Sequence, residues 1–239
     1  MVSQKSTAPQ WCMRVLIYVL GLFFLAMGVA VSVNSNLGIS PVNSLPYVIS
    51  QITGTTLSTC VIVVFCSYIL LQALILRREF KLKNLFQIVF SIIFGYFVDF
   101  AKWVVGDFAI PTYPGRLVML AISILLIAIG VLLYIEVDLV PMSMEGLSLA
   151  IAHKRKVPFH KMKIIVDCVV VVVGVVLSFL FLGRLVGIRE GTVITAVVTG
   201  KVMATLKKPM APIIRSICFQ KESGAEKEVE ELEELEGMD

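Results

Sequence analysis

Two stretches of the chain decide its fold: residues 37–50 read LGISPVNSLPYVIS, and residues 139–152 read LVPMSMEGLSLAIA. In the first stretch, Pro41 suits the first turn of a helix that Ser40 caps. A dozen helical residues reach only about 18 Å, which is too short for the roughly 30 Å hydrocarbon core of a bilayer. We therefore expect both stretches to form short helices that do not span a membrane.

Long apolar stretches surround these two segments. The mean hydropathy of the chain is +0.92, and only 16% of its 239 residues are charged, against about 25% in a soluble domain. Six stretches are long enough to form spanning helices: about 14–33, 57–76, 84–104, 116–135, 162–182 and 188–206. The sequence therefore predicts an all-α, polytopic membrane protein.

The Lys and Arg residues indicate the direction of the spans. With the N-terminus inside, 17 of the 21 basic residues lie on one face of the membrane, and the other face keeps Lys102, Arg116, Arg184 and Arg189. Basic loops of membrane proteins face the cytoplasm. We therefore expect both termini to be cytoplasmic.

The sequence partly overlays itself when it is shifted by 102 positions. The matched pairs include Gly28 with Gly130, Asn36 with Asp138, Asn43 with Glu145 and, after a three-residue insertion, Gly95 with Gly200. If the short segments do not span, each copy crosses the membrane three times. An odd number of crossings gives the two copies opposite orientations, and such inverted repeats recur in transporters.

This pattern divides the chain into five regions. They are a cytoplasmic N-terminus (1–13), a first membrane repeat (14–104), an outer loop (105–115), a second membrane repeat (116–206) and a cytoplasmic tail (207–239). The short helices follow the first and fourth spans. Residues 222–239 hold nine of the 17 acidic residues, and a run of like charge is typical of a disordered, solvated tail.

Polar residues around the short helices are candidates for a substrate or ion site. Non-helical backbone inside a membrane must be shielded by protein or line a wet cavity. The candidates are Asn36, Ser40, Asn43, Ser44, Asp138, Ser143 and Glu145. The alternative is that both segments lie flat at the membrane interfaces and cap the bundle.

Two further carboxylates lie within predicted spans. Asp99 is either a functional residue or an outer-interface residue that pairs with Lys102. Asp167 and Lys201 lie at a similar depth, and we expect a structural ion pair between them. Proton coupling by Asp167 and independent snorkelling of both side chains remain the alternatives for this pair.

The chain carries no enzyme signature and no metal-ligand spacing. We therefore expect no catalytic activity, no metal, no other cofactor and no nucleic-acid partner. The expected partners are the lipid bilayer and a small solute. Small residues such as Gly95 and Gly200 on the third and sixth spans also allow a homodimer.

Three motifs resemble the bacterial YitT/YczE-type integral membrane proteins. They are GLFFLAMGVAVSVNSNLGISPVNSLP at 21–46, FGYFVD at 94–99 and GIREGT at 187–192, followed by Gly200. The resemblance covers about residues 14–206 and implies a multi-pass protein of the bacterial inner membrane. It implies no substrate. The chain departs from the family pattern at Arg189 and Lys201, where members tend to carry Gly and Pro.

Two functions fit these features. The first is a permease for a small polar or anionic solute, with its site at the interface of the repeats. The second is a non-transport membrane protein that acts as an assembly partner, sensor or modulator of another complex. The acidic tail would then serve as a docking handle.

Overall fold

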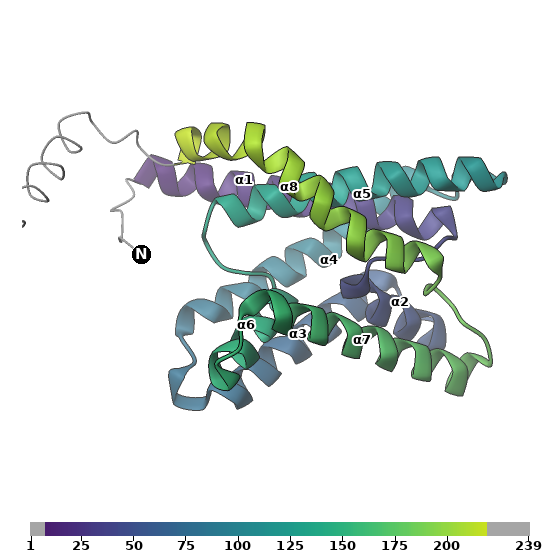
Figure 1. Ribbon diagram of the computed structural model, residues 1–239, viewed down its shortest axis with the longest axis horizontal. Helices are drawn as coiled ribbons and strands as arrows, with labels where there is room; N and C mark the ends of the chain where they lie inside the picture. The colour runs from purple at the N-terminus through teal and green to yellow at the C-terminus, as the bar shows by residue number, and fades with distance from the viewer. Residues whose placement is uncertain (1–7, 219–239) are drawn as a thin grey trace, which may run out of the picture.

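The computed structural model describes residues 8–218, and all its regular structure over that range is helical. The α-helices are α1 (Ala8–Ser35), α2 (Pro41–Thr53), α3 (Leu57–Leu76), α4 (Phe86–Val105), α5 (Tyr113–Glu136), α6 (Ser143–Arg155), α7 (Phe159–Leu182) and α8 (Glu190–Cys218) (Figure 1). Two short 3-10 helices, η1 (Arg77–Glu79) and η2 (Leu82–Leu85), connect α3 to α4. The predicted all-α class is confirmed for these residues.

Five helices are long and apolar enough to cross a membrane, namely α1, α3, α4, α5 and α7. They correspond to the first five predicted spans. The sixth predicted span, 188–206, falls in α8, which is not among the five because Lys201, Lys207 and Lys208 interrupt its apolar surface. The acidic region from residue 222, predicted to be disordered, lies outside the described residues.

Helix α8 continues to Cys218, well past the predicted end of the sixth span at residue 206. An ion-pair cluster at the end of α5 holds this extension. The buried Glu136 carboxylate lies 3.0 Å from Lys207 Nζ and 2.9 Å from Arg215 Nε. Residues 207–218 are therefore part of the folded body.

The two short helices insert into the bundle. Helices α2 and α6 have 13 residues each, and both pack against α3 and α7. Their first turns are buried, as Asn43 and Ser44 of α2 and Ser143 and Met144 of α6 illustrate. Neither helix lies flat on the surface, which disfavours the interfacial interpretation of these segments.

Helices α1 and α5 form the most extensive helix pair, and their backbones approach closely at small residues. A Cβ added to Gly130 would lie only 2.6 Å from the carbonyl oxygen of Gly21. The Ser123 hydroxyl donates to the carbonyl oxygen of Gly28 at 2.9 Å. Small residues allow this approach between helices in membrane proteins.

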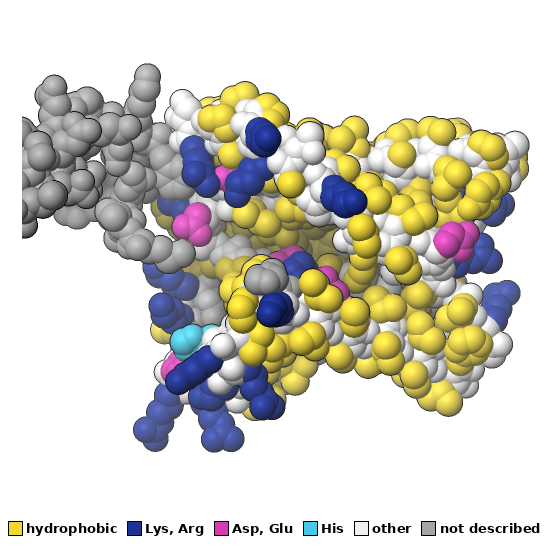
Figure 2. Space-filling view, in the orientation of Figure 1, with side chains coloured by type: hydrophobic (Ala, Val, Ile, Leu, Met, Phe, Trp, Pro, Cys, Tyr) yellow, Lys and Arg dark blue, Asp and Glu magenta, His cyan; other side chains and the backbone are white. Residues whose placement is uncertain are grey.

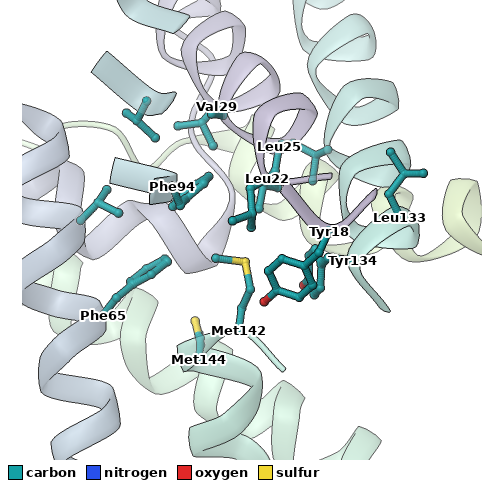
Figure 3. Packing of buried hydrophobic residues seen from close by; sticks show 14 of the residues in the cluster. Tyr18, Leu22, Leu25, Val29, Phe65, Phe94, Leu133, Tyr134, Met142 and Met144 are labelled. Atoms are coloured by element: carbon teal, nitrogen blue, oxygen red, sulfur yellow. The ribbon is translucent and has the colours of Figure 1, made fainter. Parts of the chain in front are cut away.

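Large apolar side chains fill the centre of the bundle (Figure 3). The rings of Phe65 on α3 and Phe94 on α4 stack with centroids 5.7 Å apart. Met142 and Met144, at the start of α6, point toward the same region as Tyr18 of α1 (Figure 3). The core therefore joins the beginning of a short helix to three of the long ones.

The packing of the two halves differs in one place. Helix α3 packs along α4, whereas α7 packs on α2 and α6 and makes at most sparse contact with α8 over the described residues. A Cβ at Gly95 of α4 would lie 2.6 Å from Ile62 of α3, but a Cβ at Gly200 of α8 would meet nothing within 4 Å. A gap therefore separates α7 from α8.

We expect Gly130→Ala to lower the melting temperature of the purified protein, because the new methyl group would collide with the α1 backbone. Overpacking of this kind destabilises by about 1–3 kcal/mol. Gly200→Ala is the matched control: its Cβ has open space around it, and removal of a helical Gly adds roughly 0.5–1 kcal/mol. Thermal unfolding in detergent compares the two, and a wild-type melting temperature for Gly130→Ala would contradict the close crossing.

Candidate functional site

A cavity of about 370 Å³ lies beside the gap between α7 and α8. Residues from all eight α-helices line it, and most of them are apolar. In the space-filling view, the surface is hollowed between α8 above and α6 and α7 below, and acidic and basic side chains lie in the hollow (Figure 2). The volume falls within the roughly 300–1,000 Å³ of small-molecule sites.

Three charged residues form a cluster in this cavity. Lys163 Nζ lies 3.6 Å from Glu145 Oε1 and 3.4 Å from Asp167 Oδ1, so that one ammonium group is shared by two carboxylates. All three side chains are less than a third exposed. Charged groups held inside a membrane protein usually pair with one another and face a cavity.

Polar atoms without a hydrogen-bond partner also lie at this cavity. Asn43, only 2% exposed, donates from Nδ2 to Ser40 Oγ at 3.1 Å. Among the described residues, its Oδ1 atom has no partner, and neither does Glu145 Oε2. A buried acceptor left unsatisfied costs about 1–3 kcal/mol. Thr199 Oγ1, which lines the same cavity, likewise has no partner within the described part of the chain. The site therefore holds these two acceptors and one hydroxyl that a bound ligand could satisfy.

Four of the sequence-predicted residues line this one cavity: Ser40, Asn43, Glu145 and Asp167. They come from α6, α7 and the start of α2. Ser44 lies nearby but uses its hydroxyl within α2, where it donates to the carbonyl oxygen of Pro41 at 2.8 Å.

Asn36 and Asp138 lie at the helix breaks and are exposed, each with a positive φ, 55° and 48°. The carbonyl oxygen of Asn36 accepts from Arg189 Nη1 at 2.9 Å, and that of Asp138 accepts from Arg14 Nη2 at 2.9 Å. Both residues therefore help to fix the links that precede the short helices, and neither lines this cavity.

The link before α2 is also bound directly to the link before α8. The Ile39 amide donates to the Gly187 carbonyl oxygen at 3.0 Å, and the Gly191 amide donates to the Leu37 carbonyl oxygen at 2.8 Å. A Cβ at Gly191 would lie 2.5 Å from that same Leu37 oxygen. The second glycine of the GIREGT motif, Gly191, is therefore required by the close approach of two backbones.

Asp99 and Ser143 lie outside the cavity. Asp99 is exposed on α4 and accepts a hydrogen bond from Ser58 of α3. The buried Ser143 hydroxyl contacts Ser91 Oγ at 2.8 Å, and its carbonyl oxygen accepts from Gln72 Nε2 at 2.9 Å. Ser143 thus ties α6 to α3 and α4.

The predicted ion pair between Asp167 and Lys201 is not formed among the described residues. Asp167 pairs with Lys163, one turn away on α7, and Lys201 is exposed on α8. The physical reason is the gap between α7 and α8. Because the two helices are apart there, Asp167 pairs with Lys163 on its own helix and not with Lys201 on α8.

Sequence reasoning missed Lys163, which was counted only among the 17 basic residues of the inner face. Its spacing from Asp167 is i to i+4, the spacing of facing residues on a helix, and this signal could have identified the pair. Glu136 was missed as well, since its partners Lys207 and Arg215 lie about 70 to 80 residues further along the chain.

Comparisons with known proteins agree with a membrane location. A model described as a family of unknown function (DUF6198) matches residues 12–208. The chain is 27% identical over 189 residues to the uncharacterized membrane protein YczE of Bacillus subtilis (strain 168), a match that covers 78% of this chain and 81% of that protein. It is 23% identical over 194 residues to the uncharacterized protein YyaS of the same organism, covering 80% and 90%. No solved structure matches the chain.

These matches confirm the resemblance to YczE-type membrane proteins that the motifs predict. Together with the five long apolar helices, they identify an integral membrane protein.

We expect Lys163→Met to lower the thermal stability of the protein, because it leaves two half-buried carboxylates facing each other without a cation. Removing one partner of a fully buried ion pair costs about 3–5 kcal/mol. Because this cluster faces an open cavity and is partly exposed, we expect a loss of stability near the lower end of that range. Lys154→Met is the control, since the Lys154–Glu79 pair is about half exposed. Equal melting temperatures for the two variants would contradict a structural role of the cluster.

Proposed function

We propose that this chain, which belongs to the family of unknown function DUF6198, is a permease that binds a small solute in the cavity between α7 and α8. The observation that carries the proposal is the charged cluster of Glu145, Lys163 and Asp167 inside the apolar body. Ionisable groups that face a cavity within a membrane protein mark substrate and ion pathways. The proposal assigns the chain no catalytic step.

The pairing of helices supports an arrangement as two inverted repeats, one made of α1–α4 and the other of α5–α8. Helix α2 packs on α7 as α6 packs on α3, and α1 packs on α4 as α5 packs on α8. The contacts between α1 and α5 show the same symmetry: a pair of residues that meet is matched, under the shift of 102 residues, by a second pair that also meets. Gly21 faces Gly130, and their counterparts Ser123 and Gly28 are hydrogen-bonded.

This arrangement brings equivalent positions to one site. Asn43 and Glu145 match each other in the two repeats and line the same cavity. Transporters built on inverted repeats commonly bind their substrates where broken or short helices from both repeats meet. The position of the cavity therefore fits the proposed role.

A cytoplasmic position of both termini also belongs to the proposal, within the inner membrane of a bacterium. Glu79, after α3, lies 3.1 Å from His153 and 3.6 Å from Lys154 at the end of α6. The basic segments 77–83, after α3, and 153–156, at the end of α6, therefore share one end of the molecule, where Lys and Arg side chains gather (Figure 2). The positive-inside rule favours the cytoplasm for that end.

Single cysteines in a cysteine-free background test the topology. We expect Arg77→Cys and Lys154→Cys to react with a membrane-impermeant maleimide only when the cytoplasmic side is accessible. Arg116→Cys and Arg184→Cys should react only from the outside. Labelling of residues 77 and 154 from opposite sides would overturn the inverted repeat.

Uptake into proteoliposomes tests the site. The solute is first selected by a thermal-shift screen, because a ligand that binds the native state raises its apparent stability. We expect Asn43→Leu to lower the uptake rate about tenfold or more, since a lost hydrogen bond to a buried group costs about 1–3 kcal/mol. Asp99→Asn is the control, because Asp99 does not line the cavity.

Two results would count against a permease acting through this cavity: wild-type uptake by Asn43→Leu, or loss of uptake by Asp99→Asn alone. Deletion of residues 222–239 distinguishes the permease from the second candidate function, that of an assembly partner, sensor or modulator of another complex. A permease keeps its uptake without the acidic tail, whereas an assembly partner that docks through the tail loses its activity.

A further inference from the structure

The geometry points to a ligand class for this cavity: a single-chain amphiphile with a protonated amine head group, which enters from the lipid between α7 and α8. This inference rests on the proposed function in taking the cavity as the binding site. It replaces the anionic solute that the sequence left open. Three observations carry it: the charge of the cluster, the apolar walls and the lateral gap.

The head group is set by the charges and acceptors in the cavity. Two carboxylates share one ammonium group, which leaves the cluster with one net negative charge. The unpaired Glu145 Oε2 and Asn43 Oδ1 atoms are acceptors and require donors. A protonated amine supplies three donors and one positive charge. A carboxylate or phosphate ester would bring like charge and further acceptors to the same place.

The rest of the cavity suits a hydrocarbon chain. Its apolar wall includes Leu25, Phe65, Phe94, Ile127, Val131 and Met203. The volume of about 370 Å³ lies near the lower end of the roughly 300–1,000 Å³ range of small-molecule sites. We therefore assign the cavity a ligand with one chain.

The entry route follows from the packing of α7 and α8. The exposed apolar side chains of these helices include Val169, Val172, Val173 and Val176 on α7 and Val193 on α8, although α8 also exposes Lys201, Lys207 and Lys208. In an integral membrane protein such faces contact lipid, so the gap between the two helices opens toward acyl chains. Gly200 lines the cavity beside this gap, and a Cβ added there would meet nothing within 4 Å.

Binding of radiolabelled decylamine to the full-length protein in lipid nanodiscs tests the inference, with empty nanodiscs subtracted. Decylamine is protonated at neutral pH, as a Lys side chain is. We expect saturable binding that unlabelled decylamine displaces, whereas decanoic acid and 1-decanol displace it at least about tenfold less well. Methylamine, which has the head group without the chain, should also compete poorly.

Different variants test the head-group site and the entry route between α7 and α8. We expect Glu145→Gln to weaken decylamine binding about tenfold, because it removes one negative charge and one acceptor. Gly200→Trp should weaken it by filling the gap, while Val197→Trp, on the exposed side of α8, should leave it unchanged. Melting temperatures confirm that each variant is folded, and Asp167→Asn serves as a second head-group variant if Glu145→Gln unfolds.

Equal displacement by decanoic acid, or wild-type affinity in both Glu145→Gln and Asp167→Asn, would overturn the proposed ligand class. Wild-type affinity in folded Gly200→Trp would overturn the lateral route. The permease proposal can fail independently of the ligand class. If decylamine binds as expected but proteoliposomes accumulate no solute, the ligand class stands and transport does not. If a solute is taken up but decylamine does not bind, the permease proposal stands and the proposed ligand class does not.

Discussion

The structure depends on one constraint, namely that the backbone groups at the two breaks between long and short helices need hydrogen-bond partners from other parts of the chain, because lipid supplies none. At one break, Arg189 and the Gly191 amide bind the carbonyl oxygens of Asn36 and Leu37. At the other break, Arg14 donates to the carbonyl oxygen of Val137 through both Nε and Nη2, at 2.9 and 2.7 Å. Each break is thus closed by a residue that is distant in the sequence.

Closure of these breaks lets the short helices point into the body instead of lying on it. Their first turns then reach the middle of the bundle, where Asn43 and Glu145 line one cavity. The long helices alone would fill that space with apolar packing, as α3 and α4 do around Phe65 and Phe94. The polar site therefore results from helices too short to cross the membrane.

The sequence predicts the features that depend on local pattern. Hydropathy predicts six spans, and five of them correspond to long apolar helices. The length and the Ser40-Pro41 start predict the short helix α2, although the Ser40 side chain makes no capping hydrogen bond. The shift of 102 residues pairs Asn43 with Glu145 before any coordinates are known. The sequence does not predict the features that depend on distances between helices. The gap beside Gly200 turns Asp167 toward Lys163 and away from Lys201, and no spacing in the sequence encodes that gap.

The extended end of α8 has a mechanical consequence. Ion pairs from Glu136 to Lys207 and Arg215 fasten it to α5, and the Gly191 amide fastens its other end to Leu37. Between these anchor points, α8 makes at most sparse contact with α7 over the described residues. Because no extensive helix interface within residues 8–218 fixes the clearance between α7 and α8, we expect it to respond to changes in the surrounding bilayer more readily than the close α1–α5 crossing does.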